Sequence, residues 1–147
     1  MKKFCVLCST FFVLACALVL FLPQSSFAKT SDNFQYAVWD SDYAETSSGK
    51  TFKVTFNKPV KNVHFGVVLD DTTNVDFPCD VKIRLEQDGQ VFTWKKLNFD
   101  SEGDKDYSNK YSQTIDPGTY KVYIEVSNGS GSHYIKGNGY IYYDYAN

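Results

Sequence analysis

The chain carries few of the side chains that perform catalysis. Its two histidines are His64 and His133, and behind residue 28 its one cysteine is Cys79. Nucleophilic catalysis needs a base within hydrogen-bond reach of the nucleophile and a third group that orients the base. The sequence shows no nucleophile elbow, zinc-binding histidine pair or glycine-rich phosphate loop. The chain has many carboxylates, so their number alone does not exclude the pair of acidic residues that a glycosidase uses. However, so small a domain has little room for a deep cleft. We expect a protein that is not an enzyme.

Four carboxylates gather in one short segment and are the candidate metal ligands. They are Asp100, Glu102, Asp104 and Asp106. Calcium takes about six to eight oxygen ligands and is bound weakly by extracellular modules. The spacing lacks the closing glutamate of an EF-hand loop. A solvated loop and a weak calcium site both stay open, and no other cofactor is expected. A second, weaker acidic cluster comprises Asp70, Asp71, Asp76 and Asp80.

Aromatic side chains are the strongest feature of the composition, at 17% of the chain. Tyrosine and tryptophan combine a flat apolar face with a polar group, which suits them to stack on sugar rings or to anchor protein contacts. The run from Gly139 to Tyr145 places aromatics on both faces of one strand, so a covered strand and a binding surface both stay open. Some aromatics have a predicted face that is outward or ambiguous, and these are the candidates to bind a glycan or protein ligand: Trp39, Trp94, Tyr123, Tyr142, Tyr143 and Tyr145.

Period-two alternation of apolar and polar residues runs through the chain and indicates β-strands. Gln87-Asp88-Gly89-Gln90 predicts a type I′ hairpin turn. Segments 70–78 and 100–109 are predicted loops, and no stretch sustains a helical period. We therefore predict a single all-β domain, an antiparallel β-sandwich or jelly roll of about eight strands, with its first and last strands close together. The predicted strands are residues 34–40, 51–57, 61–69, 80–87, 91–97, 111–115, 119–127, 133–136 and 139–145.

Residues 1–28 have the pattern of a cleaved signal peptide. Lys2 and Lys3 precede an apolar run from Phe4 to Leu22, and a polar segment ends at Ala28. The short basic start and long apolar core resemble bacterial export signals. The apolar run is also long enough for an uncleaved membrane anchor, and residues 13–16 have the shape of a lipobox. Cleavage after Ala28 is the reading we favour. It predicts a secreted domain of residues 29–147 without stable membrane insertion.

Charge and cysteine content exclude several kinds of partner. Loss of the two lysines of the signal changes the formal charge from −2 to −4. The remaining basic residues form no block, so nucleic acid and anionic membrane surfaces are not expected partners. Cys79 alone forms no intrachain disulfide, and we expect it to be a small buried residue of a monomer.

Residues 81–134 resemble the second half of a bacterial pre-peptidase C-terminal domain. The similarity lies in the alternating strand Val81 to Leu85, the turn at Asp88-Gly89 and the segment from Ile115 to Ile124, with its Asp-Pro-Gly-Thr-Tyr motif. The Gly-Ser turn before Tyr134 is similar too. This resemblance implies a jelly-roll-like sandwich in a family in which some members bind collagen, glycans or calcium. The paired Asp-x-Asp-Leu of such domains is absent, because residues 77–81 read Phe-Pro-Cys-Asp-Val. No functional residue is therefore carried over.

These observations together predict a secreted, non-catalytic β-sandwich that binds an extracellular glycan or protein through exposed aromatics on one sheet. The alternative is a secreted structural or peptidase-inhibitor-like protein that acts through a loop, with residues 70–78 the candidate, or through an edge strand.

Overall fold

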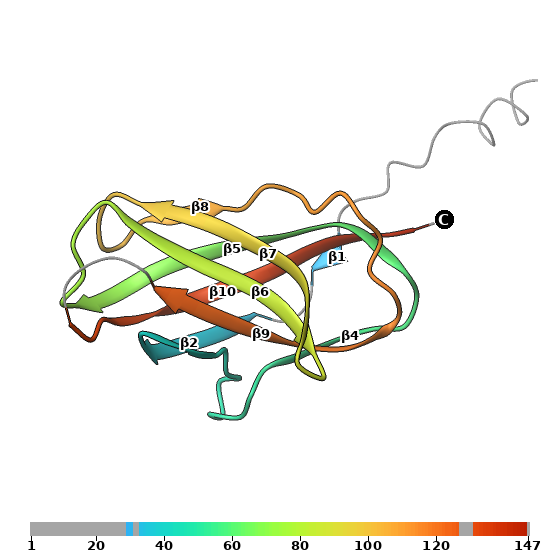
Figure 1. Cartoon of the computed structure of the whole chain (residues 1–147), viewed down its shortest axis with the longest axis horizontal. Coiled ribbons are helices and arrows are strands. Elements are labelled where there is room, and N and C mark those ends of the chain that lie inside the picture. Colours follow the sequence, from blue (N-terminus) through green and yellow to red (C-terminus); the bar gives the residue numbers. More distant parts are fainter. Residues whose placement is uncertain (1–28, 31–32, 127–130, 147) are drawn as a thin grey trace, which may run out of the picture.

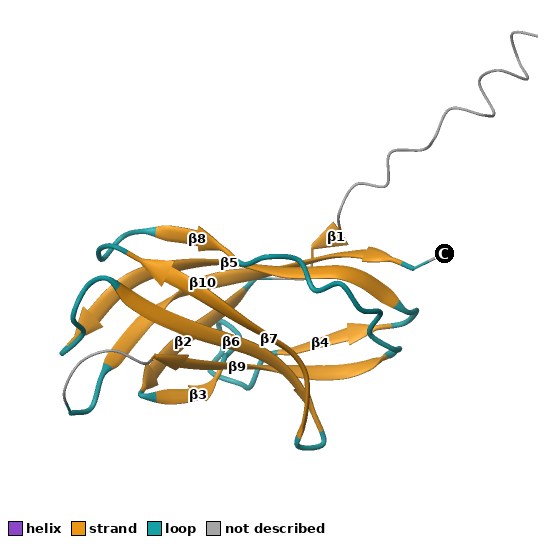
Figure 2. Ribbon diagram, turned by 45° about the horizontal axis from the view of Figure 1, so that its top comes forward, coloured by secondary structure: helices purple, strands orange, loops and turns teal. Residues whose placement is uncertain are grey.

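Alternating side chains along the strands of this chain build two antiparallel sheets with one core between them. The computed structural model describes residues 29–30, 33–126 and 131–146, and within these residues all regular structure is β-strand (Figures 1 and 2). No helix in these ranges is long and apolar enough to cross a bilayer. The signal peptide lies outside them. The strands are β1 (Lys29–Thr30), β2 (Phe34–Trp39), β3 (Ser41–Tyr43), β4 (Lys53–Phe56), β5 (Val60–Thr73), β6 (Cys79–Gln87), β7 (Gln90–Phe99), β8 (Lys105–Tyr107), β9 (Gly118–Val126) and β10 (Tyr134–Tyr145).

The strand order is that of a jelly roll. Sheet A has the order β2-β10-β5-β8, and β1 also pairs with β10. Sheet B has the order β3-β9-β6-β7, and β4 also pairs with β9. From β2 onward the chain changes sheet at every connection except β3 to β4 and β6 to β7. This order confirms the predicted jelly-roll sandwich.

The core fills the space between the sheets with the inward residues of each strand. β6 shows the pattern clearly, since Val81, Ile83 and Leu85 are fully buried between the polar residues of the same strand. Cys79 is also fully buried, as predicted, and this burial raises the pKa of its thiol to about 11. Burying one such apolar side chain stabilises the fold by about 1.5–3 kcal/mol. The alternation therefore supplies both the two-layer architecture and its main driving force.

The β6–β7 hairpin has the predicted turn. Asp88 and Gly89 have φ angles of 51° and 79°. Positive φ at both central residues defines the type I′ turn, whose twist matches that of the flanking strands.

Several predicted boundaries are wrong. β5 extends into the predicted loop at residues 70–78 and ends at Thr73, because residues 71–73 pair with β10. The predicted loop at 100–109 contains β8, and the predicted strand at 111–115 is absent, apart from one bridge between Ile115 and Val60. Ser41–Tyr43 forms a strand that was not predicted.

The last two predicted strands form one continuous strand, β10, which pairs with β2 as expected for the first and last strands. Gly137 and Gly139 interrupt the apolar pattern of β10. The rings of Tyr36 and Phe34, directly opposite on β2, occupy the space that side chains at the two glycines would need. Aromatic rings thus compensate for two glycines that look like a strand break.

Candidate functional site

The six aromatics predicted to bind a ligand do not form a single surface. Trp39 lies at the end of β2 and packs against Tyr134, with 5.2 Å between ring centroids. Trp94 and Tyr123 lie on β7 and β9, on the outer face of the other sheet. Only Tyr142, Tyr143 and Tyr145 lie close together, near the end of β10.

Tyr143, whose face the sequence pattern left ambiguous, does not face outward. It points into the core, is 9% exposed and packs 5.0 Å from the Phe56 ring. Tyr145 lies on the same side of β10, 5.8 Å from the Tyr143 ring, and Lys29 covers its face at 5.2 Å. Of these three tyrosines, only Tyr142 contributes to the outer face of sheet A.

Tyr142 belongs to an aromatic cluster whose members the sequence did not predict to lie together. We call His64, Lys105, Tyr107, Tyr140 and Tyr142 the tyrosine platform. Strand pairing brings them together: Tyr140 and Tyr107 both lie opposite Gly66 of β5, and Tyr142 lies opposite His64. Three strands, β10, β5 and β8, therefore build one aromatic surface.

The rings of the platform form a continuous surface. The His64 imidazole stacks on the Tyr142 ring at 5.0 Å with an interplanar angle of 19°. Tyr107 and Tyr140 each lie 6.3 Å from the Tyr142 ring. Tyr107 is 52% exposed, and Tyr140 is exposed as well. Tyr142 is thus the centre of the platform, and its neighbours present the accessible faces.

Gly66 allows this arrangement because it has no side chain. A Cβ atom at this position would lie 2.8 Å from Cε1 of Tyr107 and 3.1 Å from Cε2 of Tyr142. The two rings therefore lean over the backbone of β5. A glycine on the outer face, flanked by aromatic strands, was the sequence signal that could have identified the site.

Two members of the platform, Lys105 and His64, carry polar groups. Lys105 Nζ lies 4.8 Å from the Tyr107 ring centroid, and hydrogen bonding to Tyr107 raises the pKa of Lys105. His64 Nδ1 lies 2.9 Å from the carbonyl oxygen of Asn62, so Nδ1 is the donor in this contact. In the neutral ring, Nε2 is then the acceptor.

Two hydrogen-bonded Asn–Asp pairs lie at the ends of this surface. Asn62 Nδ2 donates to Asp144 at 2.9 Å, and Asn138 Nδ2 donates to Asp70 at 2.6 Å. Each pair is held in place by its own hydrogen bond. The rim of the platform therefore carries amide and carboxylate groups of fixed orientation.

The outer face of sheet B has aromatics whose surfaces are occupied by the protein's own cations. The Arg84 guanidinium carbon lies 3.9 Å from the Tyr123 ring centroid, and Lys82 Nζ lies 5.9 Å from that of Trp94. Tyr43 contacts Tyr123 edge-on at 5.2 Å. Trp94 is nevertheless 48% exposed. Lys105 likewise lies over Tyr107 of the platform at 4.8 Å, so the two faces differ mainly in how many rings are in mutual contact.

The predicted calcium loop uses its carboxylates to hold backbone groups. Asp104 accepts hydrogen bonds from the amides of Asp100 and Ser101 at 3.1 and 2.8 Å. Glu102 accepts from the amide and hydroxyl of Thr72, both at 3.0 Å. Across the described ranges, no group of three or more His, Cys, Asp or Glu residues is arranged to hold a metal ion. Calcium binding stays a prediction, and it would require these side chains to turn.

Two more of the acidic residues singled out in the sequence are likewise engaged. Asp106 accepts from the amide of Asn98 at 2.9 Å. In the second acidic cluster, Asp80 contacts Lys96 Nζ at 2.6 Å, and this contact lowers the pKa of its carboxyl. The inhibitor loop is shorter than predicted, because residues 70–73 belong to β5; residues 74–78 remain, with Phe77 exposed. The inhibitor alternative stays a prediction.

Comparison with known proteins finds structural similarity but no family. No family model matches the chain, and no curated protein matches it. A structure of the infectious bursal disease virus Gx strain has 10% sequence identity and a TM-score of 0.43, covering 82% of this chain and 32% of the viral chain. The VP2 subviral particle of the same virus has 13% identity and a TM-score of 0.40, with 81% and 32% covered. This chain thus spans about a third of either viral chain. The resemblance to pre-peptidase C-terminal domains stays a prediction, and the jelly-roll assignment rests on the strand order.

Proposed function

We propose that this protein is a secreted, non-catalytic module that binds an extracellular glycan on the tyrosine platform of sheet A. The observation that carries the proposal is the open aromatic surface of Tyr107, Tyr140 and Tyr142 above Gly66. Secretion is part of the proposal and rests on the signal-peptide pattern of residues 1–28.

The platform suits a sugar chain for a physical reason. The C–H groups on one face of a pyranose ring are apolar and weakly positive, whereas the face of an aromatic ring is negative. Tyr140 and Tyr142 lie two residues apart on one face of β10, and Tyr107 lies across β5. Successive sugar rings can therefore contact successive tyrosines, while hydroxyl groups reach Lys105 and the asparagines of the rim.

The carboxylates of the platform's rim support binding rather than hydrolysis. Glycoside hydrolysis uses two carboxyl groups that flank the scissile bond. Asp70 and Asp144 instead accept hydrogen bonds from asparagine side chains at opposite ends of the surface. An open, unbroken aromatic face between them fits a module that holds a chain without cutting it.

The test compares aromatic substitutions on the two sheets. The protein is incubated with insoluble cellulose, chitin and peptidoglycan, and affinity for tetrasaccharides of the retained polymer is then measured by isothermal titration calorimetry. We expect Tyr107→Ala and Tyr142→Ala each to weaken binding about tenfold or more, because aromatic anchors dominate such interfaces.

Trp94→Ala is the matched control, because Trp94 is exposed to a similar degree but lies on sheet B. It should bind like the unmodified protein, and thermal unfolding should show that all three variants fold. Absence of binding to all three polymers would refute the proposal. Equal losses in Trp94→Ala and Tyr107→Ala would refute the platform as the site.

A further inference from the structure

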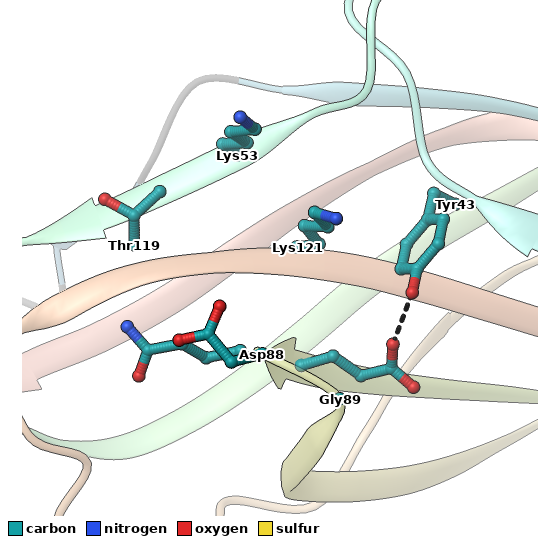
Figure 3. Close-up of a pocket in the computed structure, with 8 residues that line it drawn as sticks. Tyr43, Lys53, Asp88, Gly89, Thr119 and Lys121 are labelled. Carbon is teal, nitrogen blue, oxygen red and sulfur yellow. Dashed lines mark hydrogen bonds between the residues drawn. The ribbon is translucent and has the colours of Figure 1, made fainter.

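A cavity lies on the outer face of sheet B, beside the β6–β7 hairpin (Figure 3). Its volume is about 340 Å³, near the lower end of the range for small-molecule sites. Lys53 of β4 and Lys121 and Thr119 of β9 line one side. Residues 86–89 of the hairpin line the opposite side, and Tyr43 of β3 completes the wall. The tyrosine platform is on the other sheet and shares no residue with this cavity.

Two lysines face this cavity from directly opposite positions on neighbouring strands. Lys53 pairs with Lys121 in the register of β4 and β9. Like charges opposite one another destabilise a sheet. Within the described residues, neither ammonium group forms an ion pair. The lysines that form salt bridges there are Lys82 and Lys96. Lys121 Nζ instead lies 5.0 Å from the Tyr43 ring centroid. An anion between the two lysines would remove their repulsion.

Glu86, the carboxylate next to Lys121 in the sheet, is already engaged elsewhere. It lies opposite Lys121 in the pairing of β6 with β9. However, its Oε1 contacts Arg84 Nε at 2.6 Å, and its Oε2 accepts a hydrogen bond from the Tyr43 hydroxyl at 2.8 Å. That hydrogen bond raises the pKa of Tyr43. Glu86 is only 7% exposed. Its charge is therefore compensated by Arg84, and the charge of the lysine pair is left for a ligand.

The hairpin side of the cavity offers groups that recognise hydroxyls. Asp88 stands across the cavity from the lysines (Figure 3), and Gln87 next to it in the chain also lines the cavity. The positive φ angles of Asp88 and Gly89 fix the turn that carries them. On the lysine side, Thr119 adds a hydroxyl, which lies 3.0 Å from that of Thr55. A ligand that fits has an anionic group at one end and hydroxyl groups at the other.

We propose that this cavity binds a sugar residue that carries a carboxylate, with the carboxylate between Lys53 and Lys121 and the hydroxyls toward Asp88 and Gln87. The site is independent of the glycan platform, because it lies on the opposite sheet and uses charge rather than ring stacking. A protein with both sites would bind an acidic sugar on sheet B in addition to the glycan on sheet A.

The test is an NMR titration of the ¹⁵N-labelled protein with sodium glucuronate, which locates binding by the amides that shift. We expect shifts at Gly89, Thr119 and Lys121, and a dissociation constant that rises about tenfold in Lys53→Gln or Lys121→Gln, because hydrogen bonds to charged groups are the strong ones. Lys58→Gln is the matched control: it removes the same charge from an exposed residue outside the cavity and should leave affinity unchanged.

Further titrations separate this proposal from its alternatives. Glucose, which lacks the carboxylate, should bind at least tenfold more weakly than glucuronate, and 0.5 M NaCl should weaken glucuronate binding. Tyr142→Ala should not affect it, so failure of the platform and failure of this site are distinguishable. Equal binding of glucose, no shifts with glucuronate, or an equal loss in Lys58→Gln would overturn the site. Tighter binding of glucose 6-sulfate than of glucuronate would overturn the carboxylate assignment.

Discussion

Gly137 lies on β10 where the backbone of β5 and a ring of β2 approach it from two sides. A Cβ atom at this position would lie 1.9 Å from the carbonyl oxygen of Val68 and 2.5 Å from the hydroxyl of Tyr36. The carbonyl belongs to the neighbouring strand, so the backbone itself must move to admit a methyl group. The Tyr36 hydroxyl, which donates to this same carbonyl at 2.7 Å, must also move. Gly137→Ala therefore strains the sheet and breaks a hydrogen bond.

The expected cost follows from these two effects. Overpacking a well-packed site costs about 1–3 kcal/mol, and leaving a buried hydrogen-bonding group without its partner costs about 1–3 kcal/mol. We expect Gly137→Ala to lower the free energy of unfolding by about 4 kcal/mol, a large part of the about 5–15 kcal/mol typical of a domain. At several degrees per kcal/mol, the melting temperature should fall by about 10 °C or more.

The assay is guanidinium unfolding followed by circular dichroism, with Gly66→Ala as the matched control. Gly66→Ala adds the same methyl group to the same sheet, but its nearest neighbours are ring carbons of Tyr107 and Tyr142 at 2.8–3.1 Å. The Tyr107 ring is half-exposed and can turn into solvent, so this variant should lose less than about 1 kcal/mol. An unchanged unfolding midpoint for Gly137→Ala, or an equal loss in Gly66→Ala, would refute the steric reasoning.

Three further predictions concern the platform, the buried thiol and one surface carboxylate. Gly66→Ala should weaken binding of the platform's tetrasaccharide severalfold in calorimetry, because the added methyl group displaces the Tyr107 and Tyr142 rings. The melting temperature should stay nearly unchanged, and full affinity would contradict the role of Gly66. Cys79, whose pKa burial raises to about 11, should react with Ellman's reagent at pH 8 only after unfolding; fast labelling of the folded protein would be inconsistent with its position. The hydrogen bond from the His133 amide to Asp40 lowers the pKa of that carboxyl in the folded protein. The ionised Asp40 therefore stabilises the fold above the ordinary carboxyl pKa, and this stabilisation is lost as the pH falls through the lowered pKa of the folded state. The difference in melting temperature between the unmodified protein and Asp40→Asn should therefore shrink below about pH 4, and a constant difference from pH 7 to pH 3 would contradict this.

Local sequence signals predicted the parts of the fold that local chemistry determines. β6 alternates from Cys79 to Leu85, and the Asp88-Gly89 turn follows from the φ angles that these two residues accept. β10 was divided in two because Gly137 and Gly139 lack the side chains that periodicity detects. Their places are filled from β2, a strand about a hundred residues away in sequence. Periodicity within one segment contains no information about such a partner.

The candidate site was found only in part for the same reason. Tyr142 was predicted from its own position on an aromatic strand. Tyr107 was not, because β8 has three residues, two of them charged, within a polar segment. Its position beside Tyr142 depends on the pairing of both β8 and β10 with β5. A surface assembled across three strands becomes visible only when the strand order is known.

The place of β10 has a consequence for how the chain folds. β10 lies between β2 and β5, and β1 also pairs with it. Until β10 is in place, β1 and β2 lack the neighbour that joins them to β5, so sheet A cannot form in full. Such late, long-range pairing carries a high cost in loop-closure entropy and favours slow folding. The two sheets should therefore pack together only once β10 has paired with both β2 and β5.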